Sequence, residues 1–163
     1  MSLAILPGSY DPMTLGHLDV VLRALKDYDE VVVAVMVNPA KVTLFDMNER
    51  VAIAKATVEE LENVRVISDT GLLVDLFDRL GADAVCKGYR NETDLAYEQK
   101  MDEWNRAHNP RFQTVLYPAA EGHEVLSSTA VRAALATNAL PQGWVHPRAE
   151  ALIREKGSRN ESL

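Results

Sequence analysis

The sequence contains almost no cysteine. Its one cysteine in 163 residues, Cys86, cannot form an internal disulfide, which excludes a disulfide-stapled fold and fits a reducing compartment. The histidines lack the spacing of a metal site, relative to Cys86 or to one another; they are His17, His108, His123 and His146. We therefore predict no metal ion held by the protein's own side chains.

Long hydrophobic runs are missing as well. The most apolar stretch, residues 31–37, has the length of a buried strand. It falls far short of the roughly 20 apolar residues that a membrane-spanning helix needs. The first residues also lack the basic segment and long apolar segment of a signal peptide. We expect a cytoplasmic protein that neither spans nor anchors in a membrane.

Positive charge is scarce. The chain has 17 Lys and Arg against 24 Asp and Glu, for a net charge of -7. So acidic a protein repels polyanions through its overall field, and neither nucleic acid nor an anionic membrane is expected as a partner. A small anion could still bind to a local cluster of donors. With 47% hydrophobic and 25% charged residues, the composition is that of a globular protein with a buried core.

Segments of strand and helix character alternate along the chain. Short apolar or β-branched runs predict strands over 3–6, 31–37, 64–67, 84–86 and 112–117, with Pro7-Gly8 ending the first and Gly88 breaking the fourth. Helical spacing of apolar residues predicts helices over 17–28, 48–61, 72–80, 93–108, 127–136 and 147–156. This alternation predicts an α/β fold with a parallel five-stranded sheet, in one domain over 1–156 with a polar tail over 157–163.

The loop after the first strand has the features of an anion-binding site. It reads Pro7-Gly8-Ser9-Tyr10-Asp11-Pro12-Met13-Thr14-Leu15-Gly16-His17 and leads into a helix. Gly8 allows a ligand to approach the backbone, Ser9 offers an N–H and a hydroxyl, and His17 stands where a helix N-terminus attracts anions. The loop is neither a Walker A motif nor a G-x-G-x-x-G motif. From spacing alone, an ordinary strand–helix turn with a surface histidine stays open.

Five motifs follow one another over residues 3–153. They are Pro7 to Pro12 with Thr14-x-Gly16-His17; Asn38-Pro39-x-Lys41 with Glu49-Arg50; Gly71-Leu72-Leu73-Val74-Asp75; Lys87-Gly88-Tyr89-Arg90 with Asp94, Tyr97-Glu98 and Asn105; and Leu126-Ser127-Ser128-Thr129 with Val131-Arg132. Together they resemble the phosphopantetheine adenylyltransferases, bacterial enzymes of coenzyme A synthesis in the nucleotidylyltransferase superfamily. The resemblance implies a Rossmann-like, doubly wound parallel sheet and a homohexamer.

The resemblance also implies a reaction, adenylyl transfer from ATP to 4′-phosphopantetheine. The products would be 3′-dephospho-CoA and pyrophosphate. The nucleophile is already an anionic phosphate, so neither a general base nor a covalent intermediate is needed. The enzyme has to hold two repelling anions in line and stabilise charge at phosphorus. Mg²⁺ is expected with ATP, held mostly by phosphate oxygens and water.

Residue roles follow from the same resemblance. The implied catalytic residues are His17, which would stabilise the transition state, Lys41, which would orient the attacking phosphate, and Arg90, which would hold the ATP phosphates. The implied ATP contacts are Ser9, Tyr10, His17, Gly88, Tyr89, Arg90, Glu98, His123, Glu124, Val125, Leu126, Ser127, Ser128 and Thr129. The implied acceptor contacts are Ser9, Lys41, Leu73, Lys87 and Asn105. Most of these are neutral donors or cations, so the acidic charge is expected elsewhere, on helix surfaces such as 59–62.

Several of these residues also have simpler structural roles. Ser127 is an N-cap, Leu73 fits the apolar face of a helix, and Glu98 fits a helix surface. Cys86 lies in a predicted buried strand, where a core role is expected rather than that of a nucleophile.

The chain departs from the family pattern at a few positions. Lys87 stands where arginine is usual, and would neutralise a phosphate as a point charge without a bidentate fork. His123 replaces a common aromatic residue, and Leu95-Ala96 replace a Phe-Glu pair. These departures affect details of the nucleotide pocket and of packing rather than the reaction class.

Two alternative functions stay open. One is another small nucleotidylyltransferase, acting on nicotinate mononucleotide or glycerol phosphate, which the second and fourth motifs disfavour. The other is a nucleotide sensor without catalysis, which the joint presence of His17, Lys41 and Arg90 disfavours.

Overall fold

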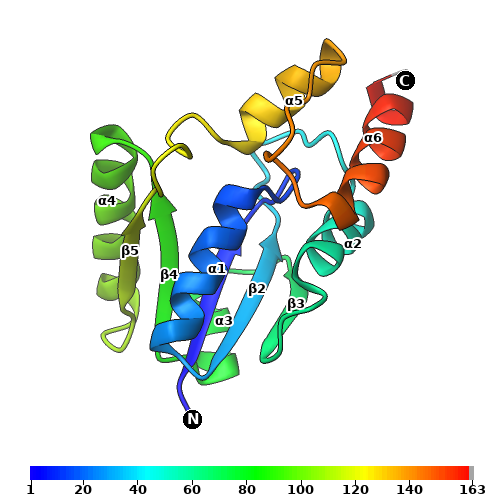
Figure 1. Ribbon diagram of the computed structural model, residues 1–163. Helices are drawn as coiled ribbons and strands as arrows, with labels where there is room; N and C mark the ends of the chain where they lie inside the picture. The colour runs from blue at the N-terminus through cyan, green and yellow to red at the C-terminus, as the bar shows by residue number, and fades with distance from the viewer. Residues whose placement is uncertain (162–163) are drawn as a thin grey trace.

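The computed structural model describes residues 1–161, which form a parallel five-stranded sheet covered by helices on both faces (Figure 1). The strands are β1 (Leu3–Gly8), β2 (Glu30–Met36), β3 (Val64–Asp69), β4 (Ala84–Tyr89) and β5 (Thr114–Pro118). Their spatial order is β3-β2-β1-β4-β5. The chain therefore builds one half of the sheet outward from β1, returns to the centre at β4 and builds the other half. This is the predicted doubly wound topology.

Two hydrophobic cores lie on the two faces of the sheet. The helices are α1 (Leu15–Asp27), α2 (Met47–Val58), α3 (Leu73–Leu80), α4 (Glu92–His108), α5 (Ser128–Ala136) and α6 (Pro147–Glu161). The larger core joins α1, α2, α5 and α6 to side chains such as Leu6 and Val33, and the smaller joins α3 to Ile5 and Val32. Neighbouring residues of β1 and β2 thus face opposite cores, which is why both strands read as continuous apolar runs.

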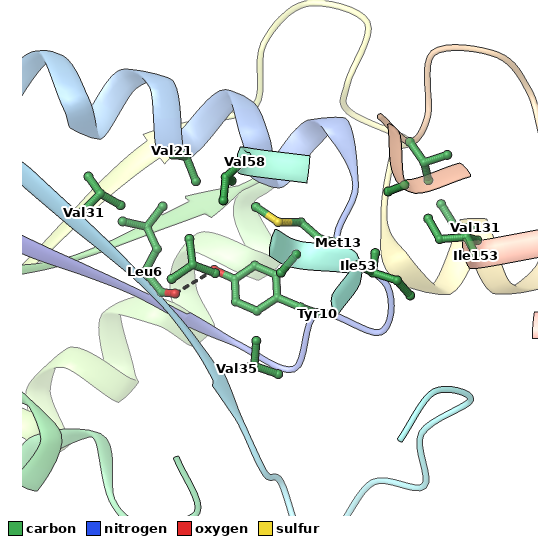
Figure 2. Close-up of a cluster of buried hydrophobic side chains, with 14 of the residues drawn as sticks. Leu6, Tyr10, Met13, Val21, Val31, Val35, Ile53, Val58, Val131 and Ile153 are labelled. Atoms are coloured by element: carbon green, nitrogen blue, oxygen red, sulfur yellow. Dashed lines mark hydrogen bonds between the residues drawn. The ribbon is translucent and has the colours of Figure 1, made fainter. Parts of the chain in front are cut away.

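Figure 2 shows part of the larger core, where Tyr10 and Met13 lie among valine and isoleucine side chains. Both belong to the loop between β1 and α1, and they are 5% and 0% exposed. The Tyr10 hydroxyl satisfies its hydrogen-bonding need inside this apolar surrounding by donating to the Leu6 carbonyl at 2.7 Å. The loop that carries the predicted anion site is therefore anchored in the core.

Local capping interactions set several helix ends. Asp46 and Glu49 form a capping box at the start of α2, with Asp46 Oδ1 accepting from the Glu49 N–H at 2.7 Å and Glu49 Oε1 accepting from the Asp46 N–H at 2.9 Å. Gly81 ends α3 in a left-handed conformation with a φ of 64°, as its position after an apolar helical run predicts.

Several predicted strand bounds were wrong: β1, β3 and β4 extend beyond their predicted ends, and β5 begins at Thr114 instead of 112. The pairing of β1 explains the first of these differences. Its pairs with β4 are Ala4–Ala84 and Ile5–Val85, whereas its pairing with β2 continues to Gly8–Val35. Pro7 can therefore stay in the strand, since no ladder on the β4 side needs the N–H that proline lacks.

Gly88 likewise does not break β4, which runs to Tyr89 and pairs Gly88 with Tyr117. A Cβ at Gly88 would lie 2.9 Å from Val20 Cγ2 of α1. The glycine allows the helix to approach the strand.

The predicted ends of two helices were also wrong. α2 ends at Val58 instead of extending to 61, and α6 continues to Glu161 through much of the predicted polar tail. Gly157 is buried there, where a Cβ would lie 3.4 Å from Leu135 Cδ1 and 3.5 Å from Phe45 Cζ. Packing against α5 thus overrides the polar composition. Residues 162–163 of the predicted tail lie outside the described residues.

None of the helices within residues 1–161 has the length and apolar character needed to cross a bilayer.

Replacing Phe45 by alanine tests how the connection between β2 and α2 is anchored. Phe45 is 0% exposed, so truncation should lower the free energy of unfolding by about 3–5 kcal/mol through lost burial and a residual cavity. Val42 in the same connection is 102% exposed, and Val42→Ala should change that free energy by less than about 0.5 kcal/mol. Urea unfolding followed by circular dichroism measures both. Similar losses in the two variants would contradict this anchoring.

Candidate active site

A cavity of about 370 Å³ lies at the carboxyl ends of β1 and β4, where the strand order reverses. This is the position at which open parallel sheets bind ligands. Its wall comes from the β1–α1 loop, the first turns of α1, the end of β4 and the segment from β5 to α5, with one residue each from the β2–α2 connection (Lys41) and α4 (Glu98). Figure 1 shows α5 beyond the carboxyl ends of the strands, above this position.

The structure brings most of the predicted site residues to this one cavity. Those on its wall are Ser9, Tyr10, His17, Lys41, Lys87, Gly88, Tyr89, Arg90, Glu98, His123, Leu126, Ser127 and Ser128. Apart from His123, they come from four of the five motifs, and Ser9 and Ser128 are 119 positions apart in the chain. The three implied catalytic residues, His17, Lys41 and Arg90, are all among them.

Five predicted residues are not on the cavity wall. Leu73 packs against the smaller core and Asn105 is buried in α4 with 5% exposure. Val125 is 70% exposed, Glu124 Oε2 accepts from the Gly122 N–H at 2.9 Å, and Thr129 Oγ1 accepts from Arg132 at 3.1 Å. Their proposed contacts with a substrate stay predictions.

The β1–α1 loop turns on Tyr10, which has a left-handed φ of 48°. This conformation is uncommon for a side chain of this size, and the buried Tyr10 ring helps to hold it. A Cβ at Gly8 would lie 3.1 Å from Tyr10 Cε2, so glycine makes room for this ring rather than for a ligand alone. From the other side, Arg50 Nη1 of α2 donates to the Ser9 carbonyl at 2.8 Å and to the Met36 carbonyl at 3.4 Å.

His17 is part of the N-terminal cap of α1. The Thr14 N–H donates to His17 Nδ1 at 3.0 Å, while Thr14 Oγ1 accepts from the N–H groups of Gly16 and His17 at 3.2 and 3.4 Å. Because Nδ1 accepts this backbone hydrogen bond, the neutral ring carries its proton on Nε2. The cap thereby selects the tautomer and leaves Nε2–H as the donor on a ring that lines the cavity.

The surroundings also keep His17 neutral. Burial, and secondly the positive charge of Arg90, lower the pKa of His17 to about 4. The Tyr10 ring contacts the imidazole edge-to-face at a centroid distance of 4.9 Å, which adds to its apolar surroundings. At neutral pH, His17 is therefore a fixed neutral donor.

Basic side chains dominate the charge of the cavity wall. Lys41, Lys87 and Arg90 line it, together with the carboxylates of Asp19 and Glu98. Both carboxylates have cationic partners: Asp19 Oδ2 lies 2.7 Å from Arg23 Nη2, and Glu98 Oε2 lies 2.8 Å from Lys87 Nζ. Arg90 Nε likewise lies 3.4 Å from Asp94 Oδ2, so the two wall carboxylates and the carboxylate beside Arg90 are already paired when an anion reaches Lys41 and Arg90.

The acidic charge is exposed elsewhere, as expected. Glu59 and Glu60 follow α2 on the surface, with side chains 67% and 78% exposed, and pair with Arg148.

The start of α5 is docked onto the β1–α1 loop. Ser127 caps the helix by accepting from the Ala130 N–H at 3.0 Å, and the Ser128 hydroxyl donates to the Pro12 carbonyl at 2.7 Å. Leu126, 4% exposed, lies against Gly16, where a Cβ would come within 3.6 Å of Leu126 Cδ2. The N-terminus of α5 therefore meets the N-terminus of α1 at one cavity. The first N–H groups of α1 already donate to Thr14 Oγ1 and to the carbonyls of Trp144 and Thr14, so its contribution is the positive end of the helix dipole and the His17 side chain, whereas the first turn of α5 can present backbone N–H groups to an anion.

Sequence reasoning missed several wall residues. Val20 lies one turn after Gly16 on α1, a spacing that could have identified it, whereas Ala119 and Ala120 carry no comparable signal. Cys86 also lines the cavity but is 1% exposed, and burial raises its pKa to about 11, which keeps the thiol protonated. Its assignment to the core rather than to nucleophilic chemistry agrees with this burial.

Within residues 1–161, the structure contains no group of three or more His, Cys, Asp or Glu side chains that could hold a metal ion.

Comparison with known proteins adds the following relatives. A cytidylyltransferase-like family model matches residues 5–134. The phosphopantetheine adenylyltransferase of Limosilactobacillus reuteri (strain DSM 20016) is 43% identical over 132 residues, covering 81% of this chain and 76% of that protein. The phosphopantetheine adenylyltransferase of Clostridium kluyveri is 42% identical over 132 residues, covering 81% of this chain and 80% of that protein.

Solved structures show similarity of fold. A bifunctional NMN adenylyltransferase/ADP ribose pyrophosphatase from Francisella tularensis superposes with a TM-score of 0.72 at 10% identity, covering 99% of this chain and 51% of that chain. A lipopolysaccharide core biosynthesis protein from Thermoplasma volcanium superposes with a TM-score of 0.54 at 24% identity, covering 74% of this chain and 97% of that chain.

The protonation of His17 gives a prediction that does not depend on any substrate. Its imidazole should titrate with a midpoint near pH 4 instead of 6.5. Between these values the unfolded chain binds a proton that the folded protein does not, so stability should decrease as the pH falls from about 6.5 towards 4.

NMR of the imidazole C–H signals measures the midpoint. Unfolding of a His17→Gln variant over the same pH range is the control, and its stability should depend less on pH. A midpoint near 6.5 would show that the surroundings of His17 in the folded protein do not lower its pKa.

Proposed function

The chain belongs to the phosphopantetheine adenylyltransferases, within the cytidylyltransferase-like family, and we propose that it transfers the adenylyl group of ATP to 4′-phosphopantetheine. The products are 3′-dephospho-CoA and pyrophosphate, which makes this a step of coenzyme A synthesis. The observation that carries the proposal is the joint placement of neutral His17 and the cations Lys41 and Arg90 on one cavity at the reversal point of the sheet.

The proposed reaction is a direct in-line displacement. A phosphate oxygen of 4′-phosphopantetheine attacks the α-phosphorus of ATP, a new P–O bond forms, and the bond to the bridging oxygen of the β-phosphate breaks. The electron pair of the broken bond leaves with pyrophosphate. Because the nucleophile is already an anion, the protein needs no general base and forms no covalent intermediate. The chain's contribution is therefore positioning and electrostatic stabilisation.

His17 is suited to the charge that develops at phosphorus. Its Nε2–H can donate to an oxygen of the α-phosphate, where negative charge grows in the transition state. The hydrogen bond from Thr14 to Nδ1 fixes the ring beforehand, so donation requires no reorientation during the reaction. A neutral donor with a pKa near 4 also keeps the same protonation state throughout the neutral pH range.

Different basic side chains and one helix N-terminus bind different phosphate groups of the two substrates. Lys41 orients the phosphate of the acceptor, and Arg90 holds the triphosphate. The N-terminus of α5, with Ser127 and Ser128, receives the β- and γ-phosphates through its free N–H groups. Lys87, held by Glu98, serves the acceptor side as a point charge.

Magnesium enters this scheme as part of the ATP substrate. It neutralises part of the triphosphate charge, and phosphate oxygens and water provide its ligands. The side chains of the cavity are consistent with magnesium bound mainly to the substrate, because the wall carboxylates Asp19 and Glu98 are already paired with basic side chains.

We also propose a homohexamer in the cytoplasm, as the family resemblance implies. Tyr97 and Trp104 of α4 are 61% and 47% exposed, which supports a contact between subunits on this helix. Sedimentation velocity tests the assembly, and a monomer at micromolar concentration would contradict it.

One assay tests the proposed activity against its alternatives. Purified protein is given MgATP and 4′-phosphopantetheine, and pyrophosphate release is followed. We expect release with this acceptor and none with nicotinate mononucleotide or glycerol phosphate. Release only with one of those acceptors would assign the chain to a different nucleotidylyltransferase, and ATP binding without turnover of any acceptor would indicate a nucleotide sensor.

Replacing His17 by alanine should lower kcat by roughly 10²–10³-fold or more, because its proposed contact strengthens only in the transition state. The dissociation constant for ATP should change little. His17→Gln is the matched control, since glutamine at this position of a capping box can still accept from the Thr14 N–H. The glutamine should recover helix stability without recovering turnover. If it recovers turnover as well, His17 serves the cap alone.

A further inference from the structure

Asp11 has a buried carboxylate close to the cavity, and the proposed mechanism does not use this carboxylate. It is 4% exposed, and both of its oxygens accept backbone hydrogen bonds from a segment more than thirty residues away in the chain. Oδ2 accepts from the Leu44 N–H at 3.0 Å, and Oδ1 accepts from the Phe45 N–H at 2.9 Å. A carboxylate buried to this extent needs such donors to offset its lost hydration.

Arg132 of α5 binds the same residue. Its Nη1 donates to the Asp11 carbonyl at 2.7 Å and lies 3.5 Å from Asp11 Oδ2, while its Nη2 donates to Thr129 Oγ1 at 3.1 Å. The Ser128 hydroxyl reaches the next carbonyl of the loop, that of Pro12, at 2.7 Å. Asp11 is thus the point at which the β1–α1 loop, the β2–α2 connection and the start of α5 are held together.

Each of these three segments carries a different part of the site. The β1–α1 loop carries Ser9 and leads into the first turn of α1, which carries His17. The start of α5 lines the phosphate end of the cavity, and the β2–α2 connection carries Lys41. Lys41 lies three residues before Leu44, in a connection where residues 38–42 are exposed. Near Lys41 the connection has local hydrogen bonds, such as that from the Lys41 N–H to the Asn38 carbonyl at 3.0 Å.

We propose that Asp11 is a positioning residue that holds the connection carrying Lys41 against the loop that leads into His17, with Arg132 extending the link to α5. The inference rests on the proposed function, since it assigns Lys41 to the acceptor phosphate. In-line transfer requires the attacking oxygen to be positioned relative to the α-phosphorus with an accuracy of a fraction of an ångström. A more mobile Lys41 therefore lowers the rate of transfer even when ATP still binds. The negative charge of Asp11 is compatible with nearby phosphates because two N–H groups and one guanidinium already neutralise it.

A double-mutant cycle between Asp11 and Lys41 tests this role. In Asp11→Asn, one carboxylate oxygen becomes an NH₂ group, so an N–H of Leu44 or Phe45 loses its acceptor. We expect kcat/KM for 4′-phosphopantetheine to fall at least tenfold while the dissociation constant for ATP stays within twofold. In a Lys41→Ala background, adding Asp11→Asn should lower kcat/KM for 4′-phosphopantetheine by less than a further twofold, because Asp11 acts through Lys41.

The matched control is Asp46→Asn. It removes the same charge at the end of the same connection, and asparagine still caps α2. Its kcat/KM should stay within twofold of wild type. If Asp11→Asn costs as much in the Lys41→Ala background as in wild type, or leaves kcat/KM unchanged, the proposal is overturned. If Asp11→Asn does not fold, Arg132→Gln replaces it in the cycle. The same changes are then expected in kcat/KM for 4′-phosphopantetheine, in the wild-type and in the Lys41→Ala background.

Limited trypsin digestion separates failure of this inference from failure of the proposed function. Asp11→Asn should speed cleavage after Lys41 at least threefold, while cleavage after Lys100 in α4 keeps its wild-type rate. Wild-type protein that releases no pyrophosphate would refute the proposed function, and the digestion would still decide whether Asp11 holds the connection. Equal cleavage rates after Lys41 in wild type and Asp11→Asn would refute the positioning role on its own.

Discussion

Strands β1 and β4 separate after the Ile5–Val85 pair, and the site depends on that separation. β1 continues to Gly8 alongside β2 alone, and Pro7 has no N–H with which to rejoin a ladder on the other side. The gap at the centre of the sheet admits the β1–α1 loop, and the reversal of strand order brings β4 and α5 to the same place. A parallel sheet with β1 and β4 paired along their whole length would close this cavity.

Interactions that stabilise the fold also prepare the chemistry. The hydrogen bond from Thr14 to His17 caps α1 and simultaneously selects the imidazole tautomer. Ser128 ties α5 to the Pro12 carbonyl and thereby places a second helix N-terminus beside the first. Because these contacts are formed before any ligand arrives, the donors of the site are preorganised, and little reorganisation is required when charge develops at a bound phosphate.

An acidic protein can bind anions when its charges are segregated. The cavity wall carries Lys41 and Arg90, and the nearby carboxylates of Asp19, Glu98 and Asp94 are each paired with a basic side chain. Glu59 and Glu60 lie on the surface beyond α2. Desolvation of the half-buried His17 in the same wall, together with the charge of Arg90, lowers its pKa and keeps it neutral, so donation of a hydrogen bond does not depend on protonation. Screening by salt weakens distant surface charges far more than these close, partly buried contacts.

Local patterns in the sequence determined the order and type of the elements, the Gly81 cap and the motifs that include His17, because these depend on neighbours along the chain. Strand pairing decided where β1 and β4 end, and packing against α5 decided the length of α6. Only the tertiary structure revealed the ion pair between Glu98 and Lys87 and the hydrogen bonds between Asp11 and the connection that carries Lys41. These contacts join residues distant in sequence, and one sequence shows each side chain without showing its partner.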